Sequence, residues 1–323
     1  MKRDHGGNLD WAVSHFGGTK AGWIDLSTGI NRQPYPVPEI SPEAWSALPT
    51  ASATTALIEA AKRAYNTQGA ILPLAGAQAA IQLIPLLSKP GRAKIMSPTY
   101  NEHAAALRAT GWVVEEAATA EETAGADLAV IVNPNNPDGR YHDRASLLAL
   151  LPRVGRLVVD ESFAAPYPEE SLAPEAGRPG LVVLRSFGKF YGLAGMRLGF
   201  ALGCAEDIAA LSQLAGPWPV CGPALEIGAQ ALADTAWAKA STARLNAEIG
   251  RMDALATKGG WAVVGGCCLF RLYATPDAQA AQAQLARHHI WSRIFPYSAH
   301  WLRLGMPGDA AEWDRLATAL AKP

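Results

Sequence analysis

The sequence predicts an α/β fold, with a mostly parallel sheet between helices in a large domain and a smaller α+β domain at the C-terminus. Short apolar runs alternate with helical segments between residues 93 and 203. This alternation is typical of parallel strands that helices cover on both faces. After Pro217 a long alanine-rich segment precedes further strand-like runs, and the change of pattern indicates a second domain. A chain of 323 residues is long enough for both.

The first fifty residues are rich in glycine, proline and tryptophan and have little periodicity. They predict an irregular arm with one helix near residues 42–48. Helical spacing of apolar residues then predicts helices over residues 54–65 and 76–87.

Six apolar runs predict the strands of the large domain, and helical segments separate several of them, as at residues 101–111 and 144–155. The strand-like runs span residues 93–98, 112–116, 127–134, 156–162, 180–187 and 196–203.

The C-terminal third predicts one long helical stretch over residues 223–255, strands over 261–274, a helix over 277–289 and a strand over 300–307. Pro217 and Pro219 mark a hinge. The predicted division is therefore an arm (1–50), a large domain (51–216) and a small domain (217–323).

Composition argues against several classes of function. A net charge of −1 offers no basic surplus for nucleic acid or an anionic membrane surface. No apolar stretch reaches the roughly 18 residues of a membrane span, and the N-terminus lacks a signal-peptide pattern. We therefore expect a cytoplasmic protein. The four cysteines include no CxxC pair, so we expect no metal site.

Polar residues follow three of the strand-like runs at the points where the strands end. Asn136 lies in the turn NPNNPDG, Asp160 ends RLVVD, and Ser186 and Lys189 follow GLVVLR. Ligands of parallel sheets bind at the carboxyl ends of the strands. Taken singly, NPNNPDG fits a simple turn, Asp160 a helix cap and Lys189 a solvated loop lysine. Their joint placement favours a binding site.

A lysine, a carboxylate and an amide at one sheet edge suit pyridoxal phosphate. This cofactor takes an amine for a Schiff base and a carboxylate that keeps its ring nitrogen protonated. Its phosphate would lie at the helix start around Gly76, where backbone N–H groups favour an anion. Ser186 and Arg197 would add a hydroxyl and a bidentate clamp. Nicotinamide, nucleotide and metallohydrolase functions lack their usual motifs in this chain.

The order of the motifs GAQ, PTY, NPNNPxG, VVDES, SFGK and GMRLG resembles the fold-type I pyridoxal-phosphate enzymes, the class I/II aminotransferase group. The resemblance implies a seven-stranded sheet and a homodimer. It also implies that Lys189 forms the Schiff base, Asp160 pairs with the ring nitrogen and Arg303 binds the substrate α-carboxylate. The cofactor-binding residues that it implies are Gly76, Ala77, Gln78, Tyr100, Asn136, Asp160, Ser186, Lys189 and Arg197.

The N-terminal stretches HGGNLDWAVSHFG and IDLSTGINRQPYP are similar to those of the threonine-phosphate decarboxylase branch of this group, which serves cobalamin biosynthesis. This resemblance implies PLP-dependent decarboxylation of L-threonine O-3-phosphate to (R)-1-amino-2-propanol O-2-phosphate. It places the N-terminal arm near the substrate. The substrate-binding residues that we expect are His5, Gly29, Ile30, Asn31, Asn136, Arg140 and Arg303.

His5 and Arg140 are the candidates for the substrate phosphate, although His5 also fits an ordinary terminal residue and Arg140 a solvated loop charge. Phe163 stands where many aminotransferases carry a tyrosine that donates to the phenolic oxygen of the cofactor. The alternatives are an aminotransferase, such as one for histidinol phosphate, and a cofactor-free partner protein of the cobalamin pathway.

Overall fold

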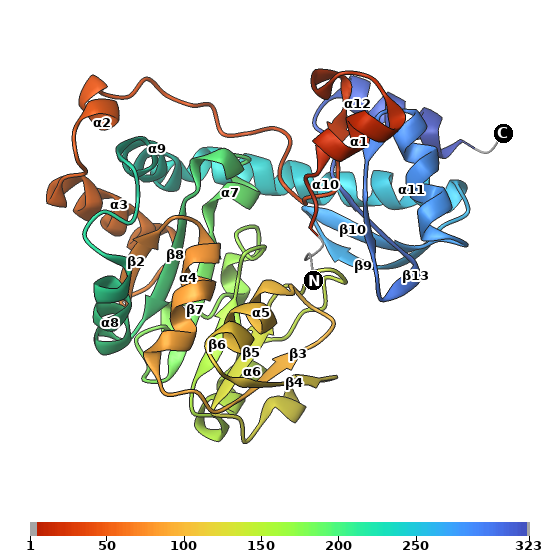
Figure 1. Cartoon of the computed structure of the whole chain (residues 1–323). Helices are drawn as coiled ribbons and strands as arrows, with labels where there is room; N and C mark the ends of the chain where they lie inside the picture. The colour runs from red at the N-terminus through yellow and green to blue at the C-terminus, as the bar shows by residue number, and fades with distance from the viewer. Residues whose placement is uncertain (1–4, 322–323) are drawn as a thin grey trace. The chain divides into compact units, whose positions relative to one another are not determined.

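The computed structural model describes residues 5–321. They form two compact units (Figure 1). The large unit comprises residues 35–136 and 141–238, and the small unit comprises the residues up to Pro34, residues 137–140 and the chain from Lys239 onward. No helix among the described residues is both long and apolar enough to cross a membrane.

The large unit is built on a seven-stranded sheet, as predicted. Strands β7, β6, β5, β3 and β4 run parallel, whereas β8 is antiparallel to both of its neighbours. The order across the sheet is β2 (Ala70–Leu74), β8 (Gly199–Gly203), β7 (Leu181–Ser186), β6 (Leu157–Asp160), β5 (Leu128–Val132), β3 (Arg92–Met96) and β4 (Val113–Ala117). Strand β2 was not predicted. It contains Pro73 and lies at the edge of the sheet, where a proline is tolerated.

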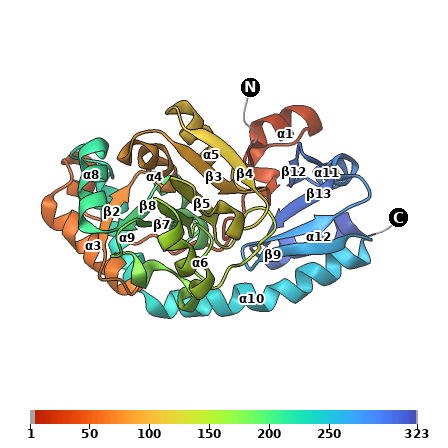
Figure 2. The same cartoon turned by 90° about the horizontal axis from the view of Figure 1, so that it is seen from below.

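Helices cover both faces of this sheet. Ile81, Leu107 and Leu211 of α4, α5 and α8 share one apolar cluster with the sheet residues Val130 and Val158. Figure 2 shows α6 on the face opposite α5. The helices of the large unit are α2 (Pro42–Ser46), α3 (Ala51–Ala64), α4 (Ala77–Leu83), α5 (Glu102–Ala109), α6 (Arg144–Leu150), α7 (Phe187–Phe190), α8 (Ala205–Ala215) and α9 (Gly222–Ala233). Its 3-10 turns are η2 (Ile84–Leu87), η3 (Glu121–Thr123), η4 (Leu151–Arg153), η5 (Pro168–Glu170), η6 (Ala173–Glu175) and η7 (Ala194–Met196).

The small unit has an antiparallel sheet in the order β12 (Arg293–Phe295), β13 (Ser298–Gly305), β10 (Phe270–Ala274) and β9 (Ala262–Cys267). A second, two-stranded parallel sheet joins β1 (Ile24–Asp25) to β11 (Ile290–Trp291). Its helical elements are α1 (Leu9–Phe16), η1 (Lys20–Gly22), α11 (Ala278–Arg287), α12 (Ala310–Leu320) and most of α10 (Thr235–Lys258). This confirms the predicted smaller α+β fold.

Two expectations about helices were wrong. Residues 9–16 form α1 instead of irregular chain, because the Asn8 side chain caps the helix and Ala12 packs against Trp23 and Trp291. The helical stretch 223–255 is not continuous, since it breaks at Asp234. There the Asp234 carboxylate accepts a hydrogen bond from the Trp237 backbone N–H at 2.9 Å and so begins α10 as a separate helix.

The turn at residues 137–140 packs backbone to backbone against β9 within the small unit. A Cβ atom on Gly139 would lie 2.3 Å from the Gly266 backbone, and one on Gly265 would lie 2.2 Å from the Asp138 carbonyl oxygen. Gly139 also has a φ of 69°, in the left-handed region. Glycine is therefore required on both sides of this contact.

Candidate active site

The end of the large-unit sheet brings Gly76, Ser186 and Arg197 together. Leu74, Gly199 and Ser186 are in register across β2, β8 and β7, so Gly76 follows directly beside the end of β7. Gly76 has a φ of 79°, and a Cβ atom there would lie 2.7 Å from Arg197 Nη2. The left-handed backbone favours glycine here, and glycine also leaves room for the guanidinium at the start of α4. This cradle of backbone and guanidinium groups fits an anion such as a cofactor phosphate.

Asp160 ends β6 as a buried carboxylate with fixed partners. Its Oδ2 lies 2.8 Å from Nε2 of His103, and its Oδ1 accepts hydrogen bonds from the backbone N–H and the hydroxyl of Ser162 at 2.9 and 2.5 Å. Burial by itself raises the pKa of Asp160, but the bonds from His103 and Ser162 outweigh burial and hold it below its ordinary value. Asp160 is therefore ionised at neutral pH.

His103 extends a polar chain that sequence reasoning missed. The hydroxyl of Tyr100 donates to Gln78 Oε1 at 3.1 Å, and the rings of Tyr100 and His103 meet edge to face with centroids 6.3 Å apart. Gln78 in turn donates to the buried Glu102 at 3.2 Å. No sequence signal singled out His103, because its role depends on Asp160, which is 57 residues away in the chain.

The asparagines of the loop after β5 have different tasks. Asn133 exchanges two hydrogen bonds with the His142 backbone, of 2.9 and 3.0 Å. Asn135 accepts from the Thr99 hydroxyl at 2.6 Å and donates to the Pro98 carbonyl at 3.0 Å. Both amides thus hold the loop in shape and are buried, whereas Asn136 is half-buried. Asn136 is thus the most exposed of the three amides, and its role as a ligand stays a prediction.

Lys189 lies on the single turn α7, which aromatic rings support. Phe187, Tyr191 and Trp237 form a stacked column with centroid separations of 4.3 and 5.3 Å. The Lys189 ammonium lies 5.6 Å from the centre of the Phe163 ring. The lysine is therefore half-buried beside an apolar ring that brings no hydroxyl to it.

A buried ion pair fastens the loop that follows Asp160. Glu161 accepts hydrogen bonds from Arg185 Nη1 and the Leu172 backbone N–H, both at 2.6 Å, and from the Ser171 hydroxyl. The Arg185 guanidinium also lies 4.5 Å from the centre of the Tyr65 ring. Because Glu161 and Arg185 are on neighbouring strand ends, the pair fixes the segment that carries Phe163.

In the small unit, Arg303 is buried in β13. Its Nη2 donates to the Ser27 carbonyl oxygen at 2.5 Å, and its guanidinium lies 5.1 Å from the centre of the Phe270 ring. Burial and the neighbouring charge of Arg293 lower the pKa of Arg303 to about 10. The side chain therefore stays cationic at neutral pH.

Arg293 was not predicted as a site residue. It stands directly opposite Arg303 in the β12–β13 pairing. Like charges at opposite positions of paired strands destabilise a sheet, so an anion bound beside both would relieve the repulsion. Sequence reasoning could not pair the two arginines, because strand register is a tertiary property.

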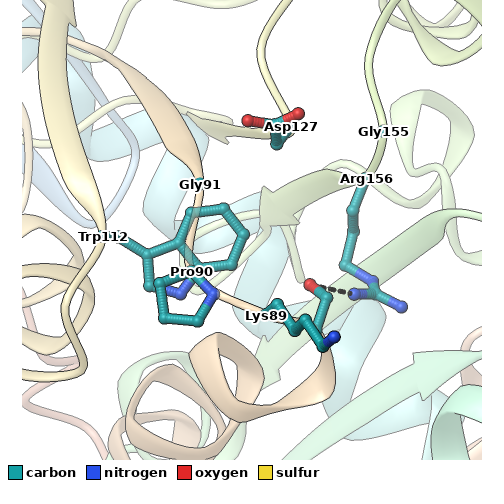
Figure 3. Close-up of a pocket in the computed structure, with 8 residues that line it drawn as sticks. Lys89, Pro90, Gly91, Trp112, Asp127, Gly155 and Arg156 are labelled. Atoms are coloured by element: carbon teal, nitrogen blue, oxygen red, sulfur yellow. Dashed lines mark hydrogen bonds between the residues drawn. The ribbon is translucent and has the colours of Figure 1, made fainter.

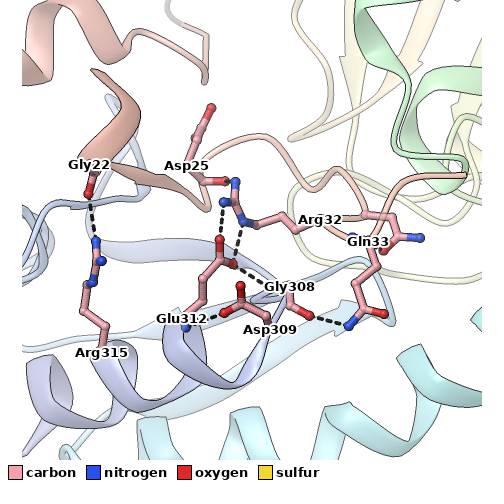
Figure 4. A network of polar contacts seen from close by, with 9 residues as sticks. Gly22, Asp25, Arg32, Gln33, Gly308, Asp309, Glu312 and Arg315 are labelled. Atoms are coloured by element: carbon pink, nitrogen blue, oxygen red, sulfur yellow. Dashed lines mark hydrogen bonds and ion pairs between the residues drawn. The ribbon is translucent and has the colours of Figure 1, made fainter. Parts of the chain in front are cut away.

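The N-terminal segment that carries Gly29, Ile30 and Asn31 is fastened at several points. The Ser27 hydroxyl accepts from the Gly7 backbone N–H at 2.7 Å and donates to Asp25 at 2.6 Å, which ties the HGG stretch to this segment. Figure 4 shows Arg32 clamped on Glu312 of α12 and Gln33 bonded to the Gly308 carbonyl oxygen.

The remaining predicted residues are less constrained. Gly29 has a φ of 63°, which suits glycine, and Ile30 is half-buried. Arg140 forms an ion pair with Asp138 at 2.8 Å, so part of its charge is already balanced. His5 is exposed in the small unit. The roles of His5 and Arg140 stay predictions.

A cavity of about 510 Å³ lies at the opposite ends of the strands of the large-unit sheet (Figure 3). Gly91, Asp127 and Arg156, which line it, directly precede β3, β5 and β6. It therefore lies at the amino ends of the strands, away from Asp160 and Ser186. Arg156 donates to Asp207 at 2.6 Å, and this ion pair balances its charge. We place the site at the carboxyl ends instead. Among residues 5–321 no group of side chains is arranged to hold a metal ion.

Comparison with known proteins gives a family. A family model described as aminotransferase class I and II matches residues 40–320. The chain is 44% identical over 324 residues to the threonine-phosphate decarboxylase of Pseudomonas aeruginosa, with 98% of this chain and 97% of that protein covered. It is 41% identical over 327 residues to the threonine-phosphate decarboxylase of Sinorhizobium sp, with 98% and 97% covered.

A solved structure supports the fold. The crystal structure of L-threonine-O-3-phosphate decarboxylase from Porphyromonas gingivalis matches with a TM-score of 0.77 at 22% identity, and covers 92% of this chain and 98% of that chain.

Proposed function

This chain belongs to the class I and II aminotransferase family, and from that premise we propose that it decarboxylates L-threonine O-3-phosphate. The product is (R)-1-amino-2-propanol O-2-phosphate, for cobalamin biosynthesis, and the cofactor is pyridoxal 5'-phosphate. The observation that carries the proposal is identity of 44% and 41%, over nearly the whole chain, to two threonine-phosphate decarboxylases.

The large unit offers the groups that the cofactor requires. Lys189 supplies the amine, Asp160 the carboxylate for the ring nitrogen and Asn136 an amide for the phenolic oxygen. The cradle of Gly76 and Arg197 takes the phosphate, with the neighbouring backbone of Ala77 and the hydroxyl of Ser186. When bound, the cofactor supplies a protonated ring that accepts the electron pair released at the substrate Cα.

The protein's own residues then have defined tasks. Asp160 holds its negative charge because His103 and Ser162 keep its pKa low. Arg303 holds the substrate carboxylate until the bond from Cα to that carbon breaks and CO₂ leaves. Lys189 Nζ delivers a proton to Cα and completes the product. Arg293 adds positive charge for the second anionic group of the substrate, beside the predicted His5 and Arg140.

A homodimer is part of the proposal. Val37, Trp45 and Leu48 are 60, 73 and 66% exposed on the segment before α3, and a second copy would cover them. Sedimentation should give a dimer, and Trp45→Asp should shift it toward the monomer. The division into an arm (1–50), a large domain (51–216) and a small domain (217–323), and a cytoplasmic location, also stay proposals.

The test is to incubate the protein with pyridoxal phosphate and threonine O-3-phosphate, without a keto acid. We expect release of CO₂ and formation of aminopropanol phosphate. Turnover that requires a keto-acid acceptor would indicate an aminotransferase instead. Absence of a visible cofactor band would indicate the cofactor-free partner protein.

A further inference from the structure

The turn that carries Lys189 has little stability of its own. Helix α7 spans only four residues, Phe187–Phe190. The Tyr191 backbone N–H donates to the Phe187 carbonyl oxygen at 3.3 Å, which is long for such a bond. An isolated turn of this length is not stable in water, because one hydrogen bond does not offset the loss of conformational freedom. The position of the Lys189 side chain therefore depends on the residues that pack against α7.

A close backbone contact fixes one side of α7. A Cβ atom on Gly188 would lie 2.6 Å from Ala194 Cα, so α7 and η7 approach each other with no room for a side chain. Arg197 follows η7, and its Nη1 donates to the Ala194 carbonyl oxygen at 3.2 Å. This contact fixes the distance between the two turns. The rotation of α7 must be fixed by the side chains that pack beside Lys189.

The rings of the two residues after Lys189 pack on one tryptophan. Phe190 and Tyr191 are 2 and 6% exposed, so α7 cannot rotate without moving buried rings. Trp237 stacks on Tyr191 with centroids 5.3 Å apart and planes inclined by 13°. It meets Phe190 edge to face, at 5.5 Å and 71°. Both arrangements are favourable for aromatic pairs, which prefer particular orientations. Trp237 therefore constrains the orientation of α7.

Trp237 is itself held within the large unit. Its backbone N–H donates to the Asp234 carboxylate at 2.9 Å, in the first turn of α10. Its ring meets that of Tyr35 edge to face, with centroids 5.3 Å apart and planes inclined by 82°. The Tyr35 backbone N–H in turn donates to the Tyr191 carbonyl oxygen at 2.8 Å. All these residues belong to the large unit, so they form one connected support for the turn.

We propose that Trp237 is a positioning residue that sets the rotation of α7 and so orients the Lys189 amine toward the substrate Cα. This rests on the proposed function, in which one proton moves from Lys189 Nζ to Cα after CO₂ leaves. Proton transfer requires the two atoms to lie within hydrogen-bond reach, and a misplacement of about 1 Å can slow a reaction about 100-fold. The expected effect is therefore on rate and not on substrate affinity.

Trp237→Leu tests the effect on rate. Leucine keeps an apolar contact but has no ring to stack on Tyr191, so α7 can rotate. We expect kcat to fall about 100-fold and KM to stay within about twofold. Trp237→Phe keeps a ring and should restore most of kcat. A wild-type kcat in Trp237→Leu would overturn the proposal.

Trp112→Leu is the matched control. Trp112 is a buried tryptophan of the same unit, in the apolar cluster beside the sheet, and it lines the cavity at the amino ends of the strands. Its replacement should lower the unfolding free energy in urea and leave kcat within about twofold. Trp237 is half-buried, so Trp237→Leu should lose less stability and much more kcat. An equal fall in kcat for the two variants would overturn the assignment.

Two further readouts do not require turnover. The circular dichroism of the visible band that forms with pyridoxal phosphate depends on the geometry in which the protein holds the cofactor. We expect a weaker signal per unit of absorbance in Trp237→Leu and recovery in Trp237→Phe.

Hydrogen exchange of the Tyr191 amide, measured without cofactor, should be faster in Trp237→Leu and unchanged in Trp112→Leu. If these readouts change as expected while wild type releases no CO₂, the positioning role is supported and the proposed function alone fails. Wild-type exchange and dichroism in Trp237→Leu would overturn the positioning role.

Discussion

Two buried carboxylates of the large unit, Asp160 and Glu161, and the buried Arg303 of the small unit have opposite electrostatic surroundings. In the large unit Asp160 lies 2.8 Å from His103 and Glu161 lies 2.6 Å from Arg185, so each of these two carboxylates has a basic partner. In the small unit Arg303 stands across the strand pair from a second arginine, and its pKa falls to about 10. The two carboxylates therefore lie beside basic groups, whereas Arg303 lies opposite a like charge.

The difference fits the two kinds of ligand that we propose. A resident cofactor profits from a site whose carboxylates are oriented and ionised in advance, since no reorganisation is then needed on binding. A substrate that comes and goes supplies its own anionic groups, which can neutralise the two arginines while it is bound. The comparison predicts different effects on activity and on stability, from the largest to the smallest.

Lys189→Ala should have the largest effect. Loss of the amine removes the group that we propose holds the cofactor and delivers the proton, so decarboxylation should fall on the order of 10³-fold or more. The visible absorbance band that forms on adding pyridoxal phosphate should vanish. Lys62→Ala, a lysine of α3 that is paired with Glu59, is the control and should keep both. A Lys189→Ala protein with normal turnover would contradict the proposed chemistry.

Arg185→Met should mainly lower stability. The substitution leaves the buried Glu161 without its cationic partner. Breaking a buried ion pair costs about 3–5 kcal/mol of unfolding free energy. The measurement is urea unfolding of the protein without substrate. The double variant Arg185→Met/Glu161→Gln should recover most of the loss. If Arg185→Met is as stable as wild type, the pairing of Glu161 with Arg185 does not stabilise the large unit.

Arg303→Met should affect binding and stability in opposite directions. Loss of the charged hydrogen bonds to the substrate carboxylate should lower kcat/KM about 100-fold. The unfolding free energy should stay equal or rise, because burial and Arg293 already disfavour this charge. Steady-state kinetics and urea unfolding give both values. A loss of stability like that of Arg185→Met would show that Arg303 is an ordinary structural ion.

The smallest expected effect is the contribution of Asp160 to the unfolding free energy at acid pH. Its pKa is lower in the folded state than its unfolded value of about 3.9. Its contribution to stability is therefore complete above pH 4 and is lost as the pH falls through the folded-state pKa. Unfolding free energy measured from pH 5 to pH 2.5 should decline more steeply for wild type than for Asp160→Asn. Parallel curves would contradict the pKa assignment.

Much of the fold could be predicted because a buried strand appears in the sequence as a short apolar run. The runs that became β5 to β8 are buried nearly throughout, and their apolar sequences identify them as strands. Strand β2 was not predicted because Pro73 argues against a strand. A proline is possible there only because β2 lies at the edge of the sheet. Helix α1 escaped because its stability depends on Trp23 and Trp291, which come later in the chain.

The site divides in the same way. Asp160, Ser186 and Lys189 could be placed because they follow strand ends, whose common edge is a consequence of parallel topology. His103 and Arg293 could not, since each matters through a partner that is distant in sequence.

The glycine contact between the 137–140 turn and β9 has a consequence for sequence libraries. Under selection for function, codons at Gly139 and Gly265 should tolerate no replacement, not even alanine, because a single methyl group meets backbone at 2.2–2.3 Å. Gly250 has open space around its missing Cβ, and its codon should accept many residues. Deep mutational scanning of the gene should therefore show that Gly139 and Gly265 tolerate only synonymous codon changes, whereas Gly250 accepts many residues.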